Sequence, residues 1–110
     1  MKLIIAIIQD KDSDKLSNRF IEHNIRATKL ASSGSFLRSG NSTFLIGIDD
    51  ERVAEVIDLI KHTSKQRNKY ITPPVALDTH VEGIYNNYPR KVRVGGGTIF
   101  VLDIEDFEQF

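Results

Sequence analysis

The residues best suited to bind a ligand lie in one stretch of the chain, between residues 24 and 47. Arg26 carries a permanent charge whose fork of donors matches a phosphate group, and Thr28 adds a hydroxyl two residues later. Asn41 can both donate to and accept from the edge of a base. Gly47 interrupts an apolar run, which leaves either a local distortion or room for a flat ligand against the backbone. These residue types predict a small ligand that carries phosphate and a planar ring.

The loop inside this stretch carries two large apolar side chains, Phe36 and Leu37, between Gly34 and Gly40. A loop this short can hardly bury both side chains against itself. We therefore expect Phe36 and Leu37 to contact a ligand or a partner chain.

A run of three glycines, residues 95–97, has two interpretations that the sequence leaves open. It can form a nest of backbone N–H groups around phosphate, or it can bend a strand. It lacks the Lys-Ser/Thr of a P-loop and a strand follows it, which excludes a Walker-type site. The basic residues 90–93 (RKVR) before it are more typical of a protected edge strand than of a ligand contact.

Three aspartates, Asp10, Asp12 and Asp14, imitate the start of an EF-hand loop. Lys15 stands where that loop requires glycine, and Ile21 stands where it requires the closing glutamate. The aspartates instead predict the N-terminus of a helix, where acidic side chains oppose the dipole and cap free N–H groups.

The three histidines are far apart in the sequence, and no two have a metal-ligand spacing. Asp78 and His80 could hold a metal or act as a base, but solvated loop residues of this kind are more common than catalytic ones. No convincing nucleophile or acid–base pair is present, so the sequence does not support catalysis.

The composition limits the class of protein. The chain has 110 residues, enough for one domain with a modest core. Its 15 basic and 15 acidic residues cancel, which argues against general binding to nucleic acid or to a membrane surface. It has no cysteine and therefore no disulfide or thiolate zinc site. The first apolar run is too short to span a membrane and has no signal-peptide cleavage pattern, so we expect a cytoplasmic protein.

The N-terminal pattern predicts a strand and then a helix. Residues 3–8 (LIIAII) form a continuous apolar run, typical of a central strand that is covered on both faces. The helix that follows carries Leu16, Phe20 and Ile21 on its buried face and ends near Asn24.

A pair of strands and a second helix follow. Alternation along the first strand of the pair places one set of residues on a single face, namely Arg26, Thr28, Leu30 and Ser32. The second strand spans residues 43–48. Acidic residues 49–51 then open a helix with one apolar stripe, made of Val53, Val56, Ile57 and Ile60.

The rest of the chain contains a long irregular segment and a last core strand. Residues 70–72 and 91–94 are typical of short strands, and residues 76–88 show no periodicity. Loops longer than about 12 residues in a small domain are usually functional or mobile. Residues 98–102 (TIFVL) form the last core strand, and we expect the two phenylalanines that follow, Phe107 and Phe110, to dock on the domain.

The element order is strand, helix, strand, strand, helix, strand. This order predicts an α+β fold with the ferredoxin-like βαββαβ arrangement. Both crossovers are right-handed, and we expect the first and third strands to be parallel neighbours in the centre of the sheet.

Three segments resemble the PII-like cyclic-di-AMP receptors. They are MKLIIAIIQDKDS at the start, NIRATKLASSGSFLRSGNSTFLIG in the middle and VRVGGGTIFVLDIEDFEQF at the end. Together they cover more than half of the chain, in the order of that family. Residues 61–90 resemble the family only in length and character.

The resemblance implies one PII-like domain over residues 1–110 that assembles as a homotrimer. One cyclic-di-AMP would bind in each of three clefts between subunits. A short T-loop at about 34–41 and a large B-loop at about 74–89 would change conformation and alter how an unidentified protein partner docks. The resemblance implies a signalling protein without catalysis, cofactor, nucleic-acid binding or membrane insertion.

The resemblance also assigns roles to residues. Arg26 and Thr28 would approach phosphate and ribose, Phe36, Leu37 and Asn41 would enclose an adenine, and the Gly47 backbone would lie near a base. The glycine run and the chain end would close the pocket from the adjoining subunit. The implied binding set is Arg26, Ala27, Thr28, Phe36, Leu37, Arg38, Asn41, Gly47, Gly95, Gly96 and Gln109.

The chain departs from the family pattern at one position, and two other classes of protein are to be compared with it. Ser35 stands where the family usually has a second glycine, and a positive φ there would cost about 1–3 kcal/mol. Nitrogen-regulatory PII proteins have a longer T-loop with a modifiable tyrosine and a Gly- and Lys-rich B-loop, which this chain lacks. The alternative from another class is a trimeric ferredoxin-like metal-binding or structural protein, supported only by Asp78, His80 and the shared architecture.

Overall fold

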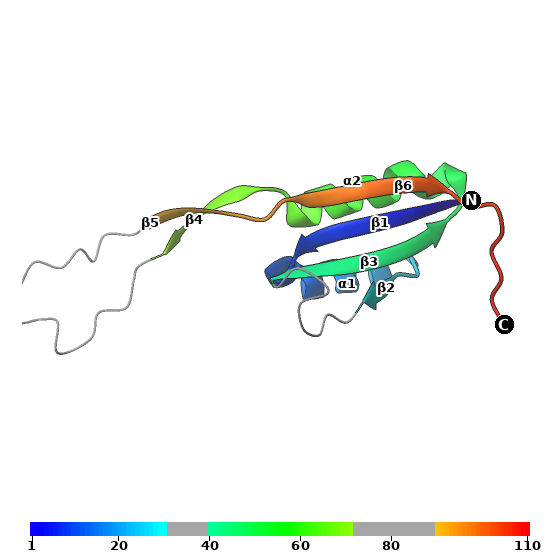
Figure 1. The fold of residues 1–110 in the computed structure, drawn as a ribbon. Helices are drawn as coiled ribbons and strands as arrows, with labels where there is room; N and C mark the ends of the chain where they lie inside the picture. The colour runs from blue at the N-terminus through cyan, green and yellow to red at the C-terminus, as the bar shows by residue number, and fades with distance from the viewer. Residues whose placement is uncertain (31–39, 72–89) are drawn as a thin grey trace, which may run out of the picture.

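The structure is a computed structural model that describes residues 1–30, 40–71 and 90–110. A four-stranded antiparallel sheet and two helices form two layers, with both helices on one face of the sheet (Figure 1). The elements of this body are β1 Lys2–Gln9, α1 Asp10–Glu22, β2 Thr28–Leu30, β3 Asn41–Ile48, a 3-10 turn Asp50–Arg52, α2 Val53–Ser64 and β6 Gly97–Asp103. The predicted α+β class and element order are confirmed.

The strand β1 lies in the centre of the sheet, whose order is β2-β3-β1-β6. It pairs with β3 and with β6, and both pairings are antiparallel. The prediction that the first and third strands are neighbours is confirmed, but the prediction that they are parallel is wrong. A right-handed crossover makes β1 and β2 parallel, and β3 then returns antiparallel between them.

The core lies between the sheet and the helices. Every second residue of β1 is buried there, as Ile4, Ala6 and Ile8 show. The rings of Phe20 in α1 and Phe44 in β3 meet edge to face, with 5.6 Å between their centroids. The apolar stripe expected for the second helix is confirmed, since Val56 and Ile60 are buried and Val53 and Ile57 pack against the core.

The opposite face of the sheet has no covering layer in the described part of the chain (Figure 1). Strand partners share a face, so Ile5 of β1 lies beside Phe100 of β6, and Leu3 lies beside Leu102. Phe100 is 51% exposed and Leu102 is 47% exposed. The prediction that the first strand is covered on both faces is therefore wrong for the isolated chain.

The helix α1 ends in a left-handed residue, Asn24, with φ 54°. The backbone N–H of Ile25 donates to the carbonyl of Phe20 at 2.8 Å, and the side chain of Ile25 is buried. The end near Asn24 was expected from the sequence. The burial expected for Ile21 is wrong, because Ile21 is 73% exposed. It follows Phe20 by about 100° around the helix and so leaves the buried stripe.

Two further strands form a separate hairpin. β4 Arg67–Ile71 and β5 Arg90–Val94 pair only with each other within the described residues. This hairpin extends away from the body, at the end of the sheet opposite the two termini (Figure 1). The sequence indicated two short strands at these places but not their pairing.

Candidate functional site

A cavity of about 410 Å³ lies at the end of the sheet where the chain begins and ends. It brings together four of the predicted binding residues and four others. The lining residues are Met1, Arg26, Thr28, Leu45, Gly47, Phe107, Glu108 and Gln109.

The turn at the end of α1 positions the polar wall of this cavity. Because Ile25 is buried, the next residue, Arg26, points outward and is exposed. Thr28 is the partner of Leu45 across β2 and β3, so its hydroxyl lies on the open face of the sheet. The guanidinium and the hydroxyl therefore share one face, as the alternation predicted.

The floor of the cavity is the backbone of β3 at Gly47. A methyl group added there would lie 3.7 Å from the ring of Phe107, which is an ordinary van der Waals contact. Gly47 has no positive φ, so the backbone conformation does not require a glycine. Without a side chain, Gly47 contributes its backbone to the lining of the cavity, beside the ring of Phe107.

The C-terminal tail supplies the outer wall. Gln109 Oε1 accepts a long hydrogen bond of 3.4 Å from Arg26 Nη1, and Phe107 is 54% exposed beside it. The remaining guanidinium donors of Arg26 have no partner among the described residues. An anion with a planar ring would find charge, a hydroxyl and an aromatic face here. Of the two phenylalanines expected to dock, Phe107 contacts the body while Phe110 is fully exposed.

Four lining residues were not among the predicted binding residues, namely Met1, Leu45, Phe107 and Glu108. Leu45 was read only as part of an apolar strand, and its pairing with Thr28 depends on the register. Phe107 could have been selected as an aromatic side chain two residues before Gln109.

Other predicted residues lie elsewhere. Asn41 is the strand partner of Gln9, whereas Gly47 is the partner of Leu3. Six residues separate these two positions along the sheet, which corresponds to roughly 20 Å. Ala27 is half-buried against the core. The loop residues Phe36, Leu37 and Arg38, most of the expected T-loop and the whole expected B-loop lie outside the described residues.

The glycines at 95 and 96 also lie at the far end of the sheet, and Gly96 lines a different cavity. That cavity, of about 470 Å³, is bounded by Ile8, Ile60, Lys61, Ser64, Lys65, Gly96, Gly97, Thr98 and Ile99. Gln109, in contrast, contacts Arg26 of its own chain. Closure of the ligand pocket by these glycines and Gln109 from an adjoining subunit stays a prediction.

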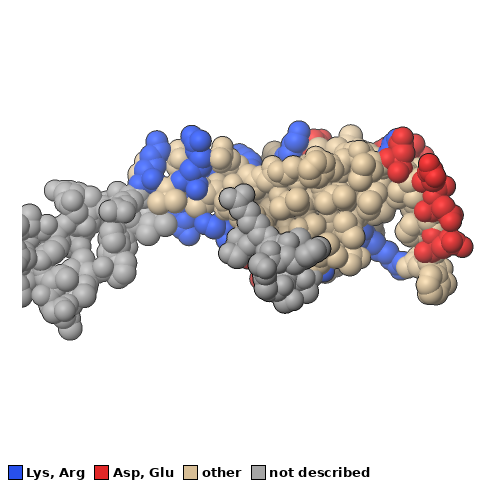
Figure 2. Space-filling view, in the orientation of Figure 1, with Lys and Arg blue, Asp and Glu red and all other residues tan. Residues whose placement is uncertain are grey.

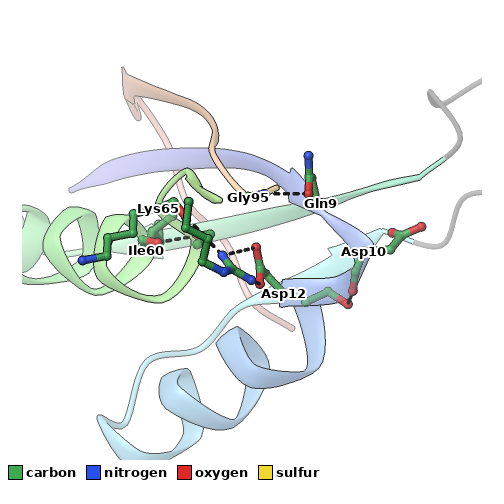
Figure 3. Close-up of polar contacts among 9 residues, drawn as sticks. Gln9, Asp10, Asp12, Ile60, Lys65 and Gly95 are labelled. Atoms are coloured by element: carbon green, nitrogen blue, oxygen red, sulfur yellow. Dashed lines mark hydrogen bonds and ion pairs between the residues drawn. The ribbon is translucent and has the colours of Figure 1, made fainter. Parts of the chain in front are cut away.

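The glycine run forms the turn between β5 and β6. Gly95 and Gly96 both have φ 85°, a conformation that favours glycine. The Gly95 N–H donates to Gln9 Oε1 at 2.7 Å (Figure 3). The Gly96 N–H donates to the carbonyl of Ser64. Because these two N–H groups bond to the protein, they do not form a phosphate nest. Of the two interpretations left open, the structure supports a bend.

The aspartates at the start of α1 bind protein groups. Asp12 is buried and accepts a hydrogen bond of 2.7 Å from Arg67 Nη2 at the base of the hairpin (Figure 3). This hydrogen bond raises the pKa of the Arg67 guanidinium above its usual value. Asp10 Oδ1 accepts from the hydroxyl of Ser42 at 2.5 Å. The N-cap residue is Gln9 and makes no side-chain cap bond, so the expected capping by aspartate is wrong.

Two histidines that are far apart in the sequence line the same cavity between α1 and α2. His23 and His62 line it, together with Glu55 and Asp58. Within residues 1–30, 40–71 and 90–110, no three His, Cys, Asp or Glu side chains form a group that could hold a metal ion. Asp78 and His80, on which the metal-binding alternative depends, lie outside the described residues.

The described helices are all too short or too polar to cross a membrane. The longest of them, α1, has 13 residues.

The comparisons with known proteins agree with the resemblance. A family model described as cyclic-di-AMP receptor matches residues 1–110. The chain is also similar to a solved structure described as a functionally unknown protein from Pediococcus pentosaceus. The two are 50% identical with a TM-score of 0.78, and the match covers 99% of this chain and 96% of that one. The chain belongs to the cyclic-di-AMP receptor family.

Proposed function

We propose that this protein is a non-catalytic signal receiver that binds cyclic-di-AMP between the subunits of a homotrimer. Family membership makes cyclic-di-AMP the expected ligand. The observation that carries the proposal is the cavity shared by Arg26, Thr28 and Gly47, which the fold assembles from separate strands. A receptor needs this recognition surface but no nucleophile or base.

The chemical groups of cyclic-di-AMP match the groups that line this cavity. Arg26 donates to a phosphate oxygen, and Thr28 adds a hydroxyl contact to the same phosphate or to the ribose. An adenine lies flat against the backbone at Gly47. The second adenine is enclosed by Phe36, Leu37, Arg38 and Asn41, with Ala27 in van der Waals contact.

The size of the cavity supports a site that two subunits complete. Its volume of about 410 Å³ lies in the lower part of the range of roughly 300–1,000 Å³ for small-molecule sites. A cyclic dinucleotide with two bases needs further walls. We propose that the turn at Gly95 and Gly96 of a neighbouring subunit supplies them, with Gln109 at the rim.

The uncovered face of the sheet supports association of identical chains. Phe100 and Leu102 on the edge strand β6 expose large apolar surfaces, and Ile5 and Leu45 lie beside them only half-buried. Contiguous apolar surface of this kind usually marks an interface. Trimer formation through this face would bury it and would align three ligand clefts.

Calorimetric titration of the purified protein with cyclic-di-AMP, ATP and cyclic-di-GMP tests the proposal. We expect binding at micromolar or lower concentration for cyclic-di-AMP alone, no turnover of the ligand, and a trimer by light scattering. The absence of heat with all three nucleotides, or a monomer that stays a monomer with ligand, would refute the proposal.

The Arg26→Ala variant tests the phosphate contact. We expect it to weaken cyclic-di-AMP binding by about 1.5–3 kcal/mol, the range for a hydrogen bond to a charged group. Arg19→Ala is the matched control, because Arg19 is an exposed arginine on α1 outside this cavity. Equal affinities of the two variants would show that Arg26 does not contact the ligand.

A further inference from the structure

The hairpin of β4 and β5 has unpaired edges. Among the described residues, its two strands pair with each other and with no third strand. An isolated two-stranded hairpin is marginally stable in water, so its base must be attached to the body. The ion pair of Arg67 with Asp12 and the hydrogen bond from Gly95 to Gln9 make that attachment (Figure 3).

The formal charge of the chain is zero, but the charged residues are not evenly spread. Figure 2 shows several Lys and Arg side chains near the hairpin and others along the body, whereas Asp and Glu gather at the end that holds the termini. Residues 65–71 and 90–98 contain no acidic residue and six basic ones, Lys65, Arg67, Lys69, Arg90, Lys91 and Arg93. The hairpin is therefore a local cationic surface.

Three exposed cations on the hairpin strands have no ion-pair partner in the described part of the chain. They are Lys69, Lys91 and Arg93. Lys91 is the strand partner of Tyr70, and Arg93 is the partner of Asn68, so these four share one face. Lys69 and its partner Val92 lie on the other face. Tyr70 is 67% exposed beside Lys91.

We propose that the edge of β5 binds an extended acidic segment of a partner protein, which adds to the hairpin as a third strand. Along β5, Lys91 and Arg93 point to one face and Val92 points to the other. A segment that alternates acidic and apolar side chains complements both faces. Its backbone pairs with the unpaired N–H and C=O groups of β5. The inference goes beyond the receptor function and does not depend on it.

The arrangement of the cations favours an acidic strand over nucleic acid. A protein that binds duplex DNA through its backbone typically neutralises roughly 6–10 phosphates from one surface. Here the cations are divided between two faces, and Arg67 is already paired with Asp12. Side chains of an added strand alternate between faces, so its acidic residues can all meet Lys91 and Arg93 while its apolar residues meet Val92.

Two occupants from this chain itself fit the edge less well. Lysine and arginine on an edge strand repel a second copy of the same hairpin. The acidic C-terminal tail contacts its own cavity through Gln109 and Phe107. The charged residues that protect the edge from self-association thus leave it open to a strand of opposite charge.

Fluorescence anisotropy with the full chain tests the charge requirement. The probe is a labelled peptide of alternating Glu and Val at low ionic strength, and we expect saturable binding. The double variant K91E/R93E should weaken binding by roughly tenfold or more, because each exposed pair becomes a repulsion. The control K15E/R19E makes the same charge change on α1 and should bind like the wild type. Equal loss in both variants would overturn the proposal.

Two further probes test the added strand and the class of partner. The same peptide with alternate amides N-methylated keeps its charge but cannot form the ladder, and we expect it not to bind. Undiminished binding of the N-methylated peptide would refute strand addition. Labelled single-stranded DNA should not bind, and binding of DNA without binding of the peptide would show that the surface recognises nucleic acid instead. Far-UV circular dichroism verifies that each variant is folded.

Discussion

The ion pair between Asp12 and Arg67 gives a quantitative test of how the hairpin is held. Two guanidinium nitrogens of Arg67 face the carboxylate, at 2.7 Å and 3.4 Å, and one of them also donates to the carbonyl of Lys65 at 3.1 Å. Removing one partner of a fully buried pair costs about 3–5 kcal/mol. The Asp12 side chain is 4% exposed but that of Arg67 is 41% exposed, so water screens the pair. We therefore expect Arg67→Met to lower the free energy of unfolding by about 1–3 kcal/mol.

A double-mutant cycle isolates the pair from the loss of packing. Replacing both partners, as Asp12→Asn with Arg67→Met, removes the unpaired buried charge and should recover most of the loss. Urea unfolding followed by far-UV circular dichroism measures each variant at one fixed concentration, since an oligomer's stability depends on concentration. Hydrogen exchange at the Gly95 and Gly96 amides, which bond at the base of the hairpin, should accelerate in Arg67→Met. A double variant that is as unstable as Arg67→Met, with unchanged exchange, would refute this role.

Two glycine substitutions give the remaining predictions. Gly47→Ala should leave the free energy of unfolding within about 1 kcal/mol of wild type, because the added methyl group would lie at an ordinary contact distance of 3.7 Å from Phe107. The same variant should bind cyclic-di-AMP measurably more weakly in calorimetric titration. Unchanged affinity would show that no ligand group approaches Gly47. Gly95→Ala should destabilise the fold by at least about 1 kcal/mol more than Gly40→Ala in urea unfolding. Both positions have positive φ, but only at Gly95 would the methyl group overlap the carbonyl of Lys65, while no atom of the described residues lies within 4 Å of the methyl position at Gly40. An equal loss of the free energy of unfolding in the two variants would mean that the backbone at Lys65 moves freely.

Local patterns predicted the elements of this fold well. The apolar run of β1 and the stripe of α2 depend on neighbouring residues, and both lie where the sequence indicated. The wrong predictions concerned which residues of each element contact the rest of the protein. Ile21 was assigned to the core although it leaves the stripe of α1, and Asp12 was expected to cap a helix although it pairs with Arg67, 55 residues away.

The residues of the candidate site also divide into those that local patterns predicted and those whose position depends on contacts between distant segments. Arg26, Thr28 and Gly47 were selected by residue type and alternation, and they do share a cavity. Asn41 belongs to the same strand as Gly47 but lies at its other end, because the register pairs Asn41 with Gln9. Phe107 enters the cavity from the C-terminal tail, a contact between residues 60 apart that no short pattern encodes.

The sequence by itself determined the helices, the central strands, the ligand class and the family, because these depend on residue type, periodicity and resemblance over short spans. Only the tertiary structure decided that β1 and β3 run antiparallel, that the Gly95 and Gly96 amides bond to Gln9 and Ser64, and that the cations of β4 and β5 lie on both faces of one hairpin. The physical reason is that contacts between distant segments set the register and the choice of partner strand. The free energy of strand pairing depends on the side chains of both strands, so neither segment alone predicts it.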